Sequence, residues 1–299
     1  MKNHEIIHPE RYLETACRFP EIFRPRDALS HKGTYGTLAV IGGAQGMSGA
    51  VVLAAAAAMY AGCGKVWAGF NQPQLPFPVI PERPEIMLST ADTLLGREDL
   101  SACVAGCGLG LGDESAALVL SALNGSRNLP LLLDADALTL LARLPEAAQA
   151  ARHYGGSLVL TPHPAEAARL LGVSVADIQA AREDAVREIS RKYRAVTVLK
   201  GHASLVCSPE GGCFANGSGN AGLATAGSGD VLSGIAGSFL AQGFDVFEAV
   251  CAAVWLHGAA ADLLRDNGIG ESGLLAGEIA PAVRRLRNFL TEALREQFP

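Results

Sequence analysis

The chain has 299 residues, of which 49% are hydrophobic and 18% are charged, and its formal net charge is −6. This composition fits a large packed core and excludes an intrinsically disordered chain. The acidic balance and the absence of a basic block argue against nucleic acid and against an anionic membrane surface as binding partners.

Seven cysteines are spread along the sequence without a C-x-x-C pair. We therefore expect reduced thiols and a cytoplasmic location, with neither a zinc site nor a disulfide framework. The charged start, M-K-N-H-E-I-I-H-P-E-R, lacks the apolar core of a signal peptide. The longest apolar run, residues 50–63, is too short to span a membrane and indicates a buried helix.

Residues 1–30 are charged and helical in places, and we expect a surface arm or an oligomer contact there. One domain over residues 31–299 follows. It begins with a strand at Thr37–Ile41, a glycine turn, an alanine-rich helix from Ser48 to about Ala61, and a strand at Lys65–Phe70. Such a unit is typical of a parallel sheet with right-handed crossovers, in which ligands bind at the carboxyl ends of the strands.

The remaining sequence continues this alternation after a proline-rich loop. Strands are predicted at residues 103–106, 130–134, 157–160 and 195–199, a β-hairpin at residues 204–215, and helices at residues 165–171, 175–193, 230–241, 245–265 and 277–297. There is no internal repeat and no linker. The sequence therefore predicts a single α/β domain with a central, mainly parallel sheet, in which the hairpin could form an antiparallel edge.

One glycine-rich stretch, N-G-S-G-N-A-G-L-A-T-A-G-S-G-D-V-L-S-G at Asn216–Gly234, contains one acid, Asp230. Apolar residues follow it and predict a helix, so Gly227, Ser228 and Gly229 lie at a helix N-terminus, where backbone N–H groups favour a phosphate. A carboxylate there would repel phosphate unless it has a role. We interpret Asp230 as a base that faces an acceptor hydroxyl, and the alternative is an Asp that only caps a core helix.

Polar side chains also follow other predicted strands. Asp134 and Asp136 flank a turn, His163 lies between two prolines, and residues 200–204 follow a further strand. These residues could converge with Asp230 at one rim of the sheet. Each has a structural alternative: the two aspartates as turn residues, His163 as a hydrogen-bonded imidazole, and Lys200 as a solvated lysine.

Motifs of several other enzyme classes are missing. The sequence has no G-x-x-x-x-G-K-[ST], no H-E-x-x-H and no G-x-S-x-G, which excludes a Walker-type P-loop enzyme. A G-x-G-x-x-G match at Gly217, Gly219 and Gly222 does not follow the first strand, so it has little weight as a dinucleotide fingerprint.

Six segments, in order, resemble the ADP/ATP-dependent NAD(P)H-hydrate dehydratases: G-T-Y-G-T-L-A-V-I-G-G, G-C-G-L-G, L-L-L-D-A-D-A-L, L-T-P-H-P-A-E, V-L-K-G-H-A-S and G-L-A-T-A-G-S-G-D-V-L-S-G. The resemblance covers roughly residues 25–290 and implies a ribokinase-like three-layer α/β/α fold. It implies dehydration of the S-epimer of NAD(P)H-hydrate to NAD(P)H, driven by ADP or ATP, through phosphorylation of the ring hydroxyl and elimination of phosphate.

The resemblance also implies the residues of the site. Contacts with the hydrated cofactor fall to Ala50, Gly110, His163 and Asp230. Contacts with ADP or ATP fall to Lys200, Gly201, His202, Ala203, Ser204 and Gly229. Asp230 would be the catalytic base, the amides of Gly227, Ser228 and Gly229 would form an anion hole, and Mg²⁺ would be needed, with its ligands unknown.

The resemblance further implies a homo-oligomer, often a tetramer, and an epimerase on a separate chain that acts on the same substrate. Two other functions stay open on sequence alone, a ribokinase-like kinase of a small alcohol or vitamin precursor and a nucleotide-binding sensor without turnover. The sequence decides neither between ADP and ATP nor between NADH-hydrate and NADPH-hydrate.

Overall fold

A computed structural model of the chain describes residues 10–125 and 127–297. Its strands are β1 (Thr37–Gly42), β2 (Lys65–Phe70), β3 (Met87–Thr90), β4 (Ala102–Cys107), β5 (Leu131–Leu133), β6 (Leu158–Leu160), β7 (Val196–Leu199), β8 (Leu205–Cys207) and β9 (Cys213–Ala215). They form one sheet in the order β3-β2-β1-β4-β5-β6-β7-β8-β9. Pairs from β3 to β7 are parallel, whereas β8 and β9 pair antiparallel, which confirms the predicted sheet and its hairpin edge.

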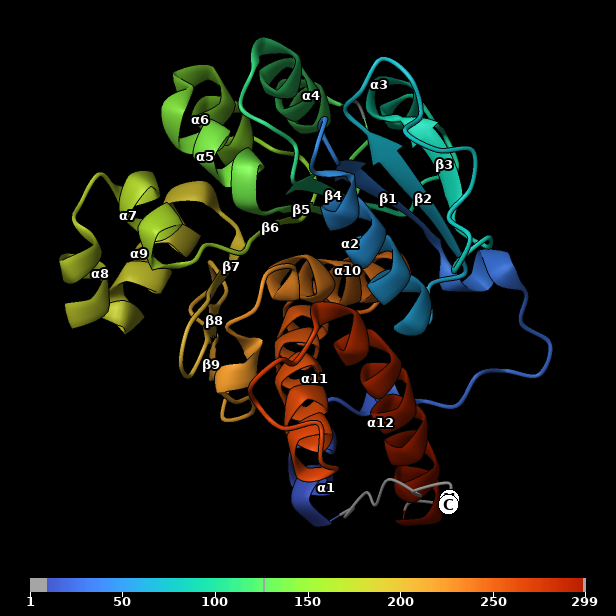
Figure 1. Cartoon of the computed structure of the whole chain (residues 1–299). Helices are drawn as coiled ribbons and strands as arrows, with labels where there is room; N and C mark the ends of the chain where they lie inside the picture. The colour runs from blue at the N-terminus through green and yellow to red at the C-terminus, as the bar shows by residue number, and fades with distance from the viewer. Residues whose placement is uncertain (1–9, 126, 298–299) are drawn as a thin grey trace.

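Helices cover both faces of the sheet (Figure 1). One face carries α2 (Ser48–Tyr60), α10 (Ser228–Ala241), α11 (Val246–Asp266) and α12 (Ala276–Gln297). The other carries α3 (Ala91–Leu95), α4 (Asp113–Asn124), α5 (Ala135–Arg143), α6 (Pro145–Arg152), α7 (Pro164–Leu171), α8 (Val175–Ala180) and α9 (Arg182–Tyr193). The described residues therefore form three layers.

Successive residues of the central strands face the two helical layers in turn. In β1, Leu38 and Val40 pack into the core beneath α2 and α10, while Ala39 and Ile41 pack into the opposite core. All six residues of β1 are buried. This pattern explains why the strand is a continuous apolar run, because helices exclude water from both of its faces.

Small residues bring α10 against α2 and against the sheet. A Cβ atom on Gly234 would lie 2.0 Å from the carbonyl oxygen of Ala54, and one on Gly237 would lie 2.4 Å from Cγ2 of Val104. No larger residue fits at these positions, so the glycines and alanines of the two helices permit a close approach of their backbones. This packing fixes where the N-terminus of α10 lies.

Among the described helices, α11 is long and apolar enough by composition to cross a membrane. Its most apolar window is 83% buried inside the protein. Trp255, Leu256 and Ala260 are among its buried residues, and α11 packs between α10 and α12. Burial at the centre of a helical layer accounts for its apolar composition.

The start of the chain differs from the expected surface arm where the structure describes it. The helix α1 (Glu10–Ala16) and the short 3₁₀ helix Pro20–Phe23 bury Tyr12, Phe19, Ile22 and Phe23 in the core. The Phe23 ring meets the Trp255 ring of α11 edge-on, with centroids 6.0 Å apart. With the buried Ala16, the apolar side chains at positions 12, 16, 19 and 22 are three to four residues apart among charged ones, so the segment packs onto the domain.

Two further expectations need correction. The helix predicted over residues 175–193 is two helices, because Ala181 leaves the helical conformation at φ −138° and ψ 55°. The thiols of Cys207 and Cys213 form a disulfide, so the expectation of reduced cysteines is wrong for this pair. The two residues lie opposite each other on β8 and β9, a juxtaposition that comes from hairpin register rather than from a sequence motif.

Candidate active site

The predicted site residues from several strands meet at the carboxyl edge of the sheet. Backbone hydrogen bonds join neighbouring strand ends, since Lys200 N donates to the Pro162 carbonyl at 2.9 Å and Asp134 N donates to the Ala105 carbonyl at 3.0 Å. The N-terminus of α10 reaches the same edge. The sequence-based expectation of a common rim is therefore borne out for Asp134, His163, Lys200 and the turn that begins α10.

A buried ion pair lies at the centre of this rim. Lys200 Nζ donates to Asp134 Oδ1 at 2.7 Å, and Ser233 Oγ of α10 donates to Asp134 Oδ2 at 2.7 Å. Burial alone would raise the pKa of Asp134, but the Lys200 charge and these hydrogen bonds hold that pKa below its ordinary value. Burial likewise opposes the charge of Lys200, yet Asp134 and Glu166 raise its pKa. Both groups are therefore ionised at neutral pH, and they tie β5, β7 and α10 together.

The turn at the start of α10 leaves room beside Lys200. Gly227 has φ +87°, and a Cβ atom there would lie 2.5 Å from Leu53 Cδ1, so this position requires glycine. A Cβ atom on Gly229 would point at Lys200 Nζ, 3.6 Å away, and at Asp134 Oδ2, 3.9 Å away. A group bound over Gly229 would therefore meet the ammonium directly.

Of the three amides expected in the anion hole, those of Gly227, Ser228 and Gly229, one is already used. Ser228 N–H donates to the carbonyl of Thr225 at 3.3 Å, so it is already used within the turn. Gly229 and Asp230 are the second and third residues of α10, whose N–H groups have no acceptor inside the helix. The amides of Gly229 and Asp230, next to the Lys200 ammonium, are therefore available for an anion.

Asp230 lies in the first turn of α10 and is partly buried. Burial, with the negative charges of Asp134 and Asp136, raises its pKa to about 6, although the Cys107 thiol and Lys200 act in the opposite direction. A carboxylate with a pKa this close to neutrality suits a general base, because it is mostly ionised at neutral pH yet binds a proton strongly enough to remove one from an alcohol.

The residues expected on the cofactor side have distinct environments. Gly110 N–H donates to Asp136 Oδ2 at 2.8 Å, which anchors the glycine loop after β4 beside the rim. Ala50 lies in the first turn of α2, and its N–H is paired with the Met47 carbonyl at 3.2 Å. Ala50 packs against the same loop, because a Cβ atom on Gly108 would lie 3.2 Å from Ala50 Cβ.

His163 caps the N-terminus of α7. Its ring Nδ1 accepts hydrogen bonds from Ala165 N and Glu166 N. The backbone N–H of His163 donates to Glu166 Oε2 at 2.7 Å. Burial, with the charges of Lys200 and Arg169, lowers the pKa of His163, so the ring is neutral at neutral pH. Its side chain is 47% exposed, and its Nε2 lies 3.4 Å from Glu166 Oε1 while Nδ1 holds the backbone, so the exposed part of the ring faces the site.

The turn at residues 201–204 follows Lys200 at the surface. Gly201 has φ +141° and Ala203 has φ +52°, and Ser204 Oγ donates to the Gly201 carbonyl at 3.1 Å. Arg182, at the start of α9, donates to the carbonyls of Leu199 and Lys200. His202 and Ala203 are exposed, so the turn presents backbone and small side chains beside Lys200.

Four further residues belong to this site although the sequence did not single them out. Glu166 is buried 4.0 Å from Lys200 Nζ, and burial raises its pKa to about 7. Ser233 follows Asp230 by three residues, a helical spacing that could have revealed it. His257 of α11 lies 3.3 Å from Ser228 Oγ, and burial lowers its pKa to about 4. Cys107 is fully buried at the end of β4 beside Asp230.

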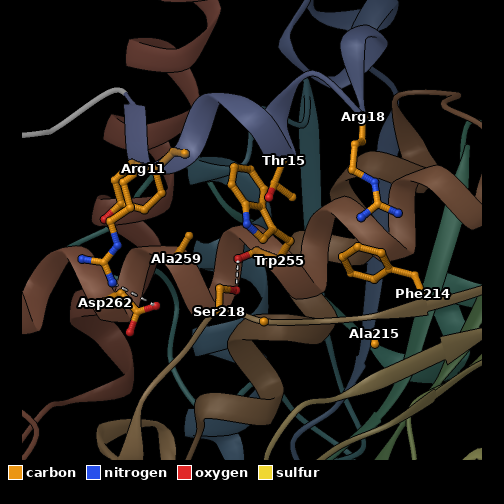
Figure 2. A pocket seen from close by; sticks show the side chains of 11 residues that line it. Arg11, Thr15, Arg18, Phe214, Ala215, Ser218, Trp255, Ala259 and Asp262 are labelled. Carbon is orange, nitrogen blue, oxygen red and sulfur yellow. Dashed lines mark hydrogen bonds and ion pairs between the residues drawn. The ribbon is translucent and has the colours of Figure 1, made fainter.

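Two hollows are lined by residues outside this cluster. Figure 2 shows a cavity of about 210 Å³ where Arg11, Thr15 and Arg18 of the first helical segment face Trp255 and the start of the glycine-rich stretch. A larger cavity of about 490 Å³ lies between α3 and α4. No group of three or more His, Cys, Asp or Glu side chains within residues 10–125 and 127–297 could hold a metal on its own.

This arrangement can stabilise a phosphoryl group and accept a proton within one small region. The Lys200 ammonium and two helix N-terminal amides supply positive potential, and Asp230 supplies a carboxylate whose pKa is near 6. Groups of these kinds are the requirements for phosphoryl transfer to a hydroxyl.

Comparison with known proteins agrees with that chemistry. A profile of the NAD(P)H-hydrate dehydratase family matches residues 38–282. The ADP-dependent (S)-NAD(P)H-hydrate dehydratase of Neisseria meningitidis serogroup B is 59% identical over 282 residues, which cover 94% of this chain and 95% of the relative. The bifunctional NAD(P)H-hydrate repair enzyme of Escherichia coli K12 is 40% identical over 268 residues, and the aligned part covers 89% of this chain but 50% of that relative.

A solved structure gives the same result. The ADP/ATP-dependent NAD(P)H-hydrate dehydratase from Bacillus subtilis, co-crystallized with ATP/Mg²⁺, superposes with a TM-score of 0.80 at 33% identity, over 91% of this chain and 96% of that one. The likeness confirms the expected ribokinase-like three-layer fold.

Proposed function

Because the chain belongs to the NAD(P)H-hydrate dehydratase family, we propose that it converts the S-epimer of NAD(P)H-hydrate back to NAD(P)H at the expense of ADP or ATP. The N. meningitidis relative is named as ADP-dependent, which favours ADP as the donor. The observation that supports this function best is the position of Asp230, in the first turn of α10 and close enough to Lys200 and Asp134 for their charges to act on its pKa.

The first step is phosphorylation of the hydrate. The substrate's hydroxyl lies on the ring carbon next to the ring nitrogen, and Asp230 removes its proton while the oxygen attacks the terminal phosphorus of the nucleotide. The bond from that phosphorus to the bridging oxygen breaks, and AMP leaves when ADP is the donor. The amides of Gly229 and Asp230 and the Lys200 ammonium stabilise the negative charge on the transferred group.

The second step is elimination. Hydroxide is a poor leaving group, but phosphate is a good one, so the lone pair of the ring nitrogen expels phosphate from the neighbouring carbon. Loss of a proton from the adjacent ring carbon then restores the dihydropyridine. The sum is NADH-hydrate and ADP giving NADH, AMP and phosphate, and the phosphorylated cofactor is transient.

Lys200 and the turn after it would bind the nucleotide. The Asp134 and Ser233 hydrogen bonds hold Lys200 in place, so little side-chain freedom would be lost when phosphate binds. Gly201, His202, Ala203 and Ser204 then continue along the surface as the contacts expected for the rest of the nucleotide. Ala50, Gly110 and His163 would contact the hydrated cofactor, Ala50 by packing rather than by its N–H.

Magnesium is part of this proposal. Mg²⁺ in nucleotide-dependent enzymes usually binds through one or two carboxylates together with substrate phosphates and water, so the lack of a three-residue cage among the described residues fits an ion that binds with the nucleotide. Glu166, 4.0 Å from Lys200 Nζ, would be one carboxylate that holds it beside the nucleotide phosphates. When bound, Mg²⁺ neutralises charge on the transferred phosphoryl group.

The cellular setting is also inferred. The E. coli relative is named as bifunctional, and this chain spans about half its length, so we infer that an epimerase supplies the S-epimer to this enzyme. A cytoplasmic location and a homo-oligomer, such as a tetramer, complete the proposal.

The test is to mix the purified protein with Mg²⁺, NADH-hydrate and either ADP or ATP, and to follow the dihydronicotinamide absorbance. We expect the absorbance to return with at least one nucleotide, together with free phosphate. A stable phosphorylated product without that absorbance would indicate an alcohol kinase instead. No change in absorbance with either nucleotide would overturn the proposed function.

A further inference from the structure

The cavity between α3 and α4 lies beside the proposed site. It has a volume of about 490 Å³, within the range of small-molecule sites. Its lining comes from the carboxyl ends of β2 and β3, the start of α3 and one face of α4. Figure 1 shows how these elements are arranged at this end of the sheet. The residues that line it are Phe70, Asn71, Gln72, Pro73, Thr90, Ala91, Asp92, Leu95, Glu114, Ala117, Leu118 and Ser121.

Two amide side chains connect this cavity with the loops expected to contact the hydrated cofactor. Asn71 Nδ2 donates to the Leu109 carbonyl at 2.8 Å and to Ser115 Oγ at 3.0 Å, directly beside Gly110. Gln72 Nε2 donates to Ser48 Oγ at 2.9 Å, in the turn that leads to Ala50. The lining of the cavity is therefore hydrogen-bonded to the loops on the cofactor side of the rim.

Gly110 stands between the cavity and the catalytic cluster. Its N–H is held by Asp136, whose charge acts on Asp230, while a Cβ atom on Gly110 would lie 3.3 Å from Ser115 Oγ of α4. A dinucleotide whose nicotinamide ring faces Asp230 would thus pass over the glycine loop and reach α3 and α4 with its far end. That end is an adenosine.

The lining matches a nucleoside rather than a phosphate. Pro73, Leu95 and Leu118 offer apolar surface above the buried Phe70, and the side chains of Thr90 and Ser121 offer hydroxyl groups. Among the residues that line the cavity, the charged ones are Asp92 and Glu114, both carboxylates and both exposed. Carboxylates accept hydrogen bonds from ribose hydroxyls and repel a 2′-phosphate, as in dinucleotide sites that prefer NAD over NADP.

We propose, on the basis of the function proposed above, that the α3–α4 cavity binds the adenosine end of the hydrated dinucleotide, with Asp92 and Glu114 at its ribose. The two carboxylates then select NADH-hydrate over NADPH-hydrate, because the latter carries a phosphate on that ribose. Hydrogen bonds within the helix start keep Asp92 ionised, since the Thr90 hydroxyl and the Thr93 backbone lower its pKa.

The experiment compares wild type with the double variant Asp92→Asn/Glu114→Gln, using (S)-NADH-hydrate and (S)-NADPH-hydrate. Wild type should show the lower KM for NADH-hydrate, and the double variant should reduce that preference by about tenfold, the size expected for repulsion between several exposed charges in salt. The KM for ADP should not move. Asp113→Asn is the matched control, because Asp113 precedes Glu114 on α4, is exposed and does not line the cavity.

A second variant tests occupancy itself. Ala117→Trp places an indole in the cavity from an exposed position on α4, and it should raise KM for both hydrates without raising KM for ADP. Unchanged KM values for both hydrates, or an unchanged preference in Asp92→Asn/Glu114→Gln, would overturn the inference.

Direct binding of the products separates this inference from the proposed function. NADH and NADPH are titrated into the same proteins by fluorescence, without nucleotide. A wild type inactive on both hydrates would refute the proposed function, and the cavity would still be tested by the ratio of the two dissociation constants. Equal affinity of wild type for NADH and NADPH would refute the carboxylate selection even in an active enzyme.

Discussion

The cluster of Asp134, Lys200 and Asp230 at the strand ends and the α3–α4 cavity lie on the same edge of the sheet, but their charged side chains differ in burial and pairing. In the cluster, Asp134 is 2% exposed and is neutralised by Lys200 at 2.7 Å. In the cavity, Asp92 and Glu114 are exposed, and the lining provides them with no cation. Buried, paired charges hold a fixed geometry for chemistry, whereas exposed, unpaired charges act by repelling the wrong ligand. Changes in the cluster should therefore affect kcat and stability, and changes in the cavity should affect KM.

The largest effect is expected at Asp230. Asp230→Asn keeps the shape of the side chain but removes the base, so kcat should fall by about 10³-fold, within the range of general-base catalysis. The KM for ADP should change little, because the Gly229 amide and Lys200 remain. Steady-state kinetics measure both values.

Asp245→Asn is the control for this variant, because Asp245 is the N-cap residue just before α11, so it is also an aspartate at a helix N-terminus but lies outside the site. It should keep nearly the wild-type kcat. A rate for Asp230→Asn within tenfold of wild type would refute the assignment of the base.

The next effect concerns the buried pair. Asp134→Asn leaves the Lys200 ammonium buried without its partner, and Lys200→Met leaves the Asp134 carboxylate in the same state. Each should lower the free energy of unfolding by about 3 kcal/mol. The double variant Asp134→Asn/Lys200→Met should lose less than the sum of the two single variants, since neither buried charge remains. Urea unfolding measures all four proteins, and strictly additive losses would show that the pair is not coupled.

A smaller effect is expected from pH. Burial and the neighbouring carboxylates raise the pKa of Asp230 to about 6, so the fraction present as base should fall tenfold for each pH unit below that value. The kcat/KM profile should fall accordingly on its acidic side. This loss of activity does not come from unfolding caused by the titration of Asp230. A carboxyl group whose pKa is raised in the folded state stabilises the fold as the pH falls from about 6 towards 3.8. A profile that is flat from pH 7 to pH 5 would contradict the assignment.

Much of the cluster could be predicted from the sequence, because glycines and charged residues directly follow apolar strand segments. The G-S-G-D turn marked Asp230, and K-G-H-A-S marked Lys200. Which backbone amides are free beside Asp230 could be seen only in the structure. The Ser228 N–H donates to the Thr225 carbonyl, whereas the amides of Gly229 and Asp230 remain available for an anion. No local pattern could show that Asp134 pairs with Lys200, since 66 residues separate them.

The cavity could not be predicted in the same way. Its walls combine the end of β2, the start of α3 and one face of α4, and none of these segments contains a recognisable motif. Neither β3 nor α3 follows from a sequence pattern, because both elements are short and come after a proline-rich loop. The cavity depends on how these elements pack, which short-range patterns do not specify.

The central claim is that phosphate is placed transiently on the hydroxyl of the substrate ring. The most direct measurement uses (S)-NADH-hydrate whose ring hydroxyl carries ¹⁸O, with ADP and Mg²⁺ in unlabelled water, quenched within one turnover. Mass spectrometry of the released phosphate is normalised to the label left in unreacted hydrate. Phosphorylation followed by elimination breaks the bond between carbon and oxygen, so each phosphate should carry one ¹⁸O. Unlabelled phosphate, with the label in water, would show that the nucleotide is hydrolysed separately and would contradict the account.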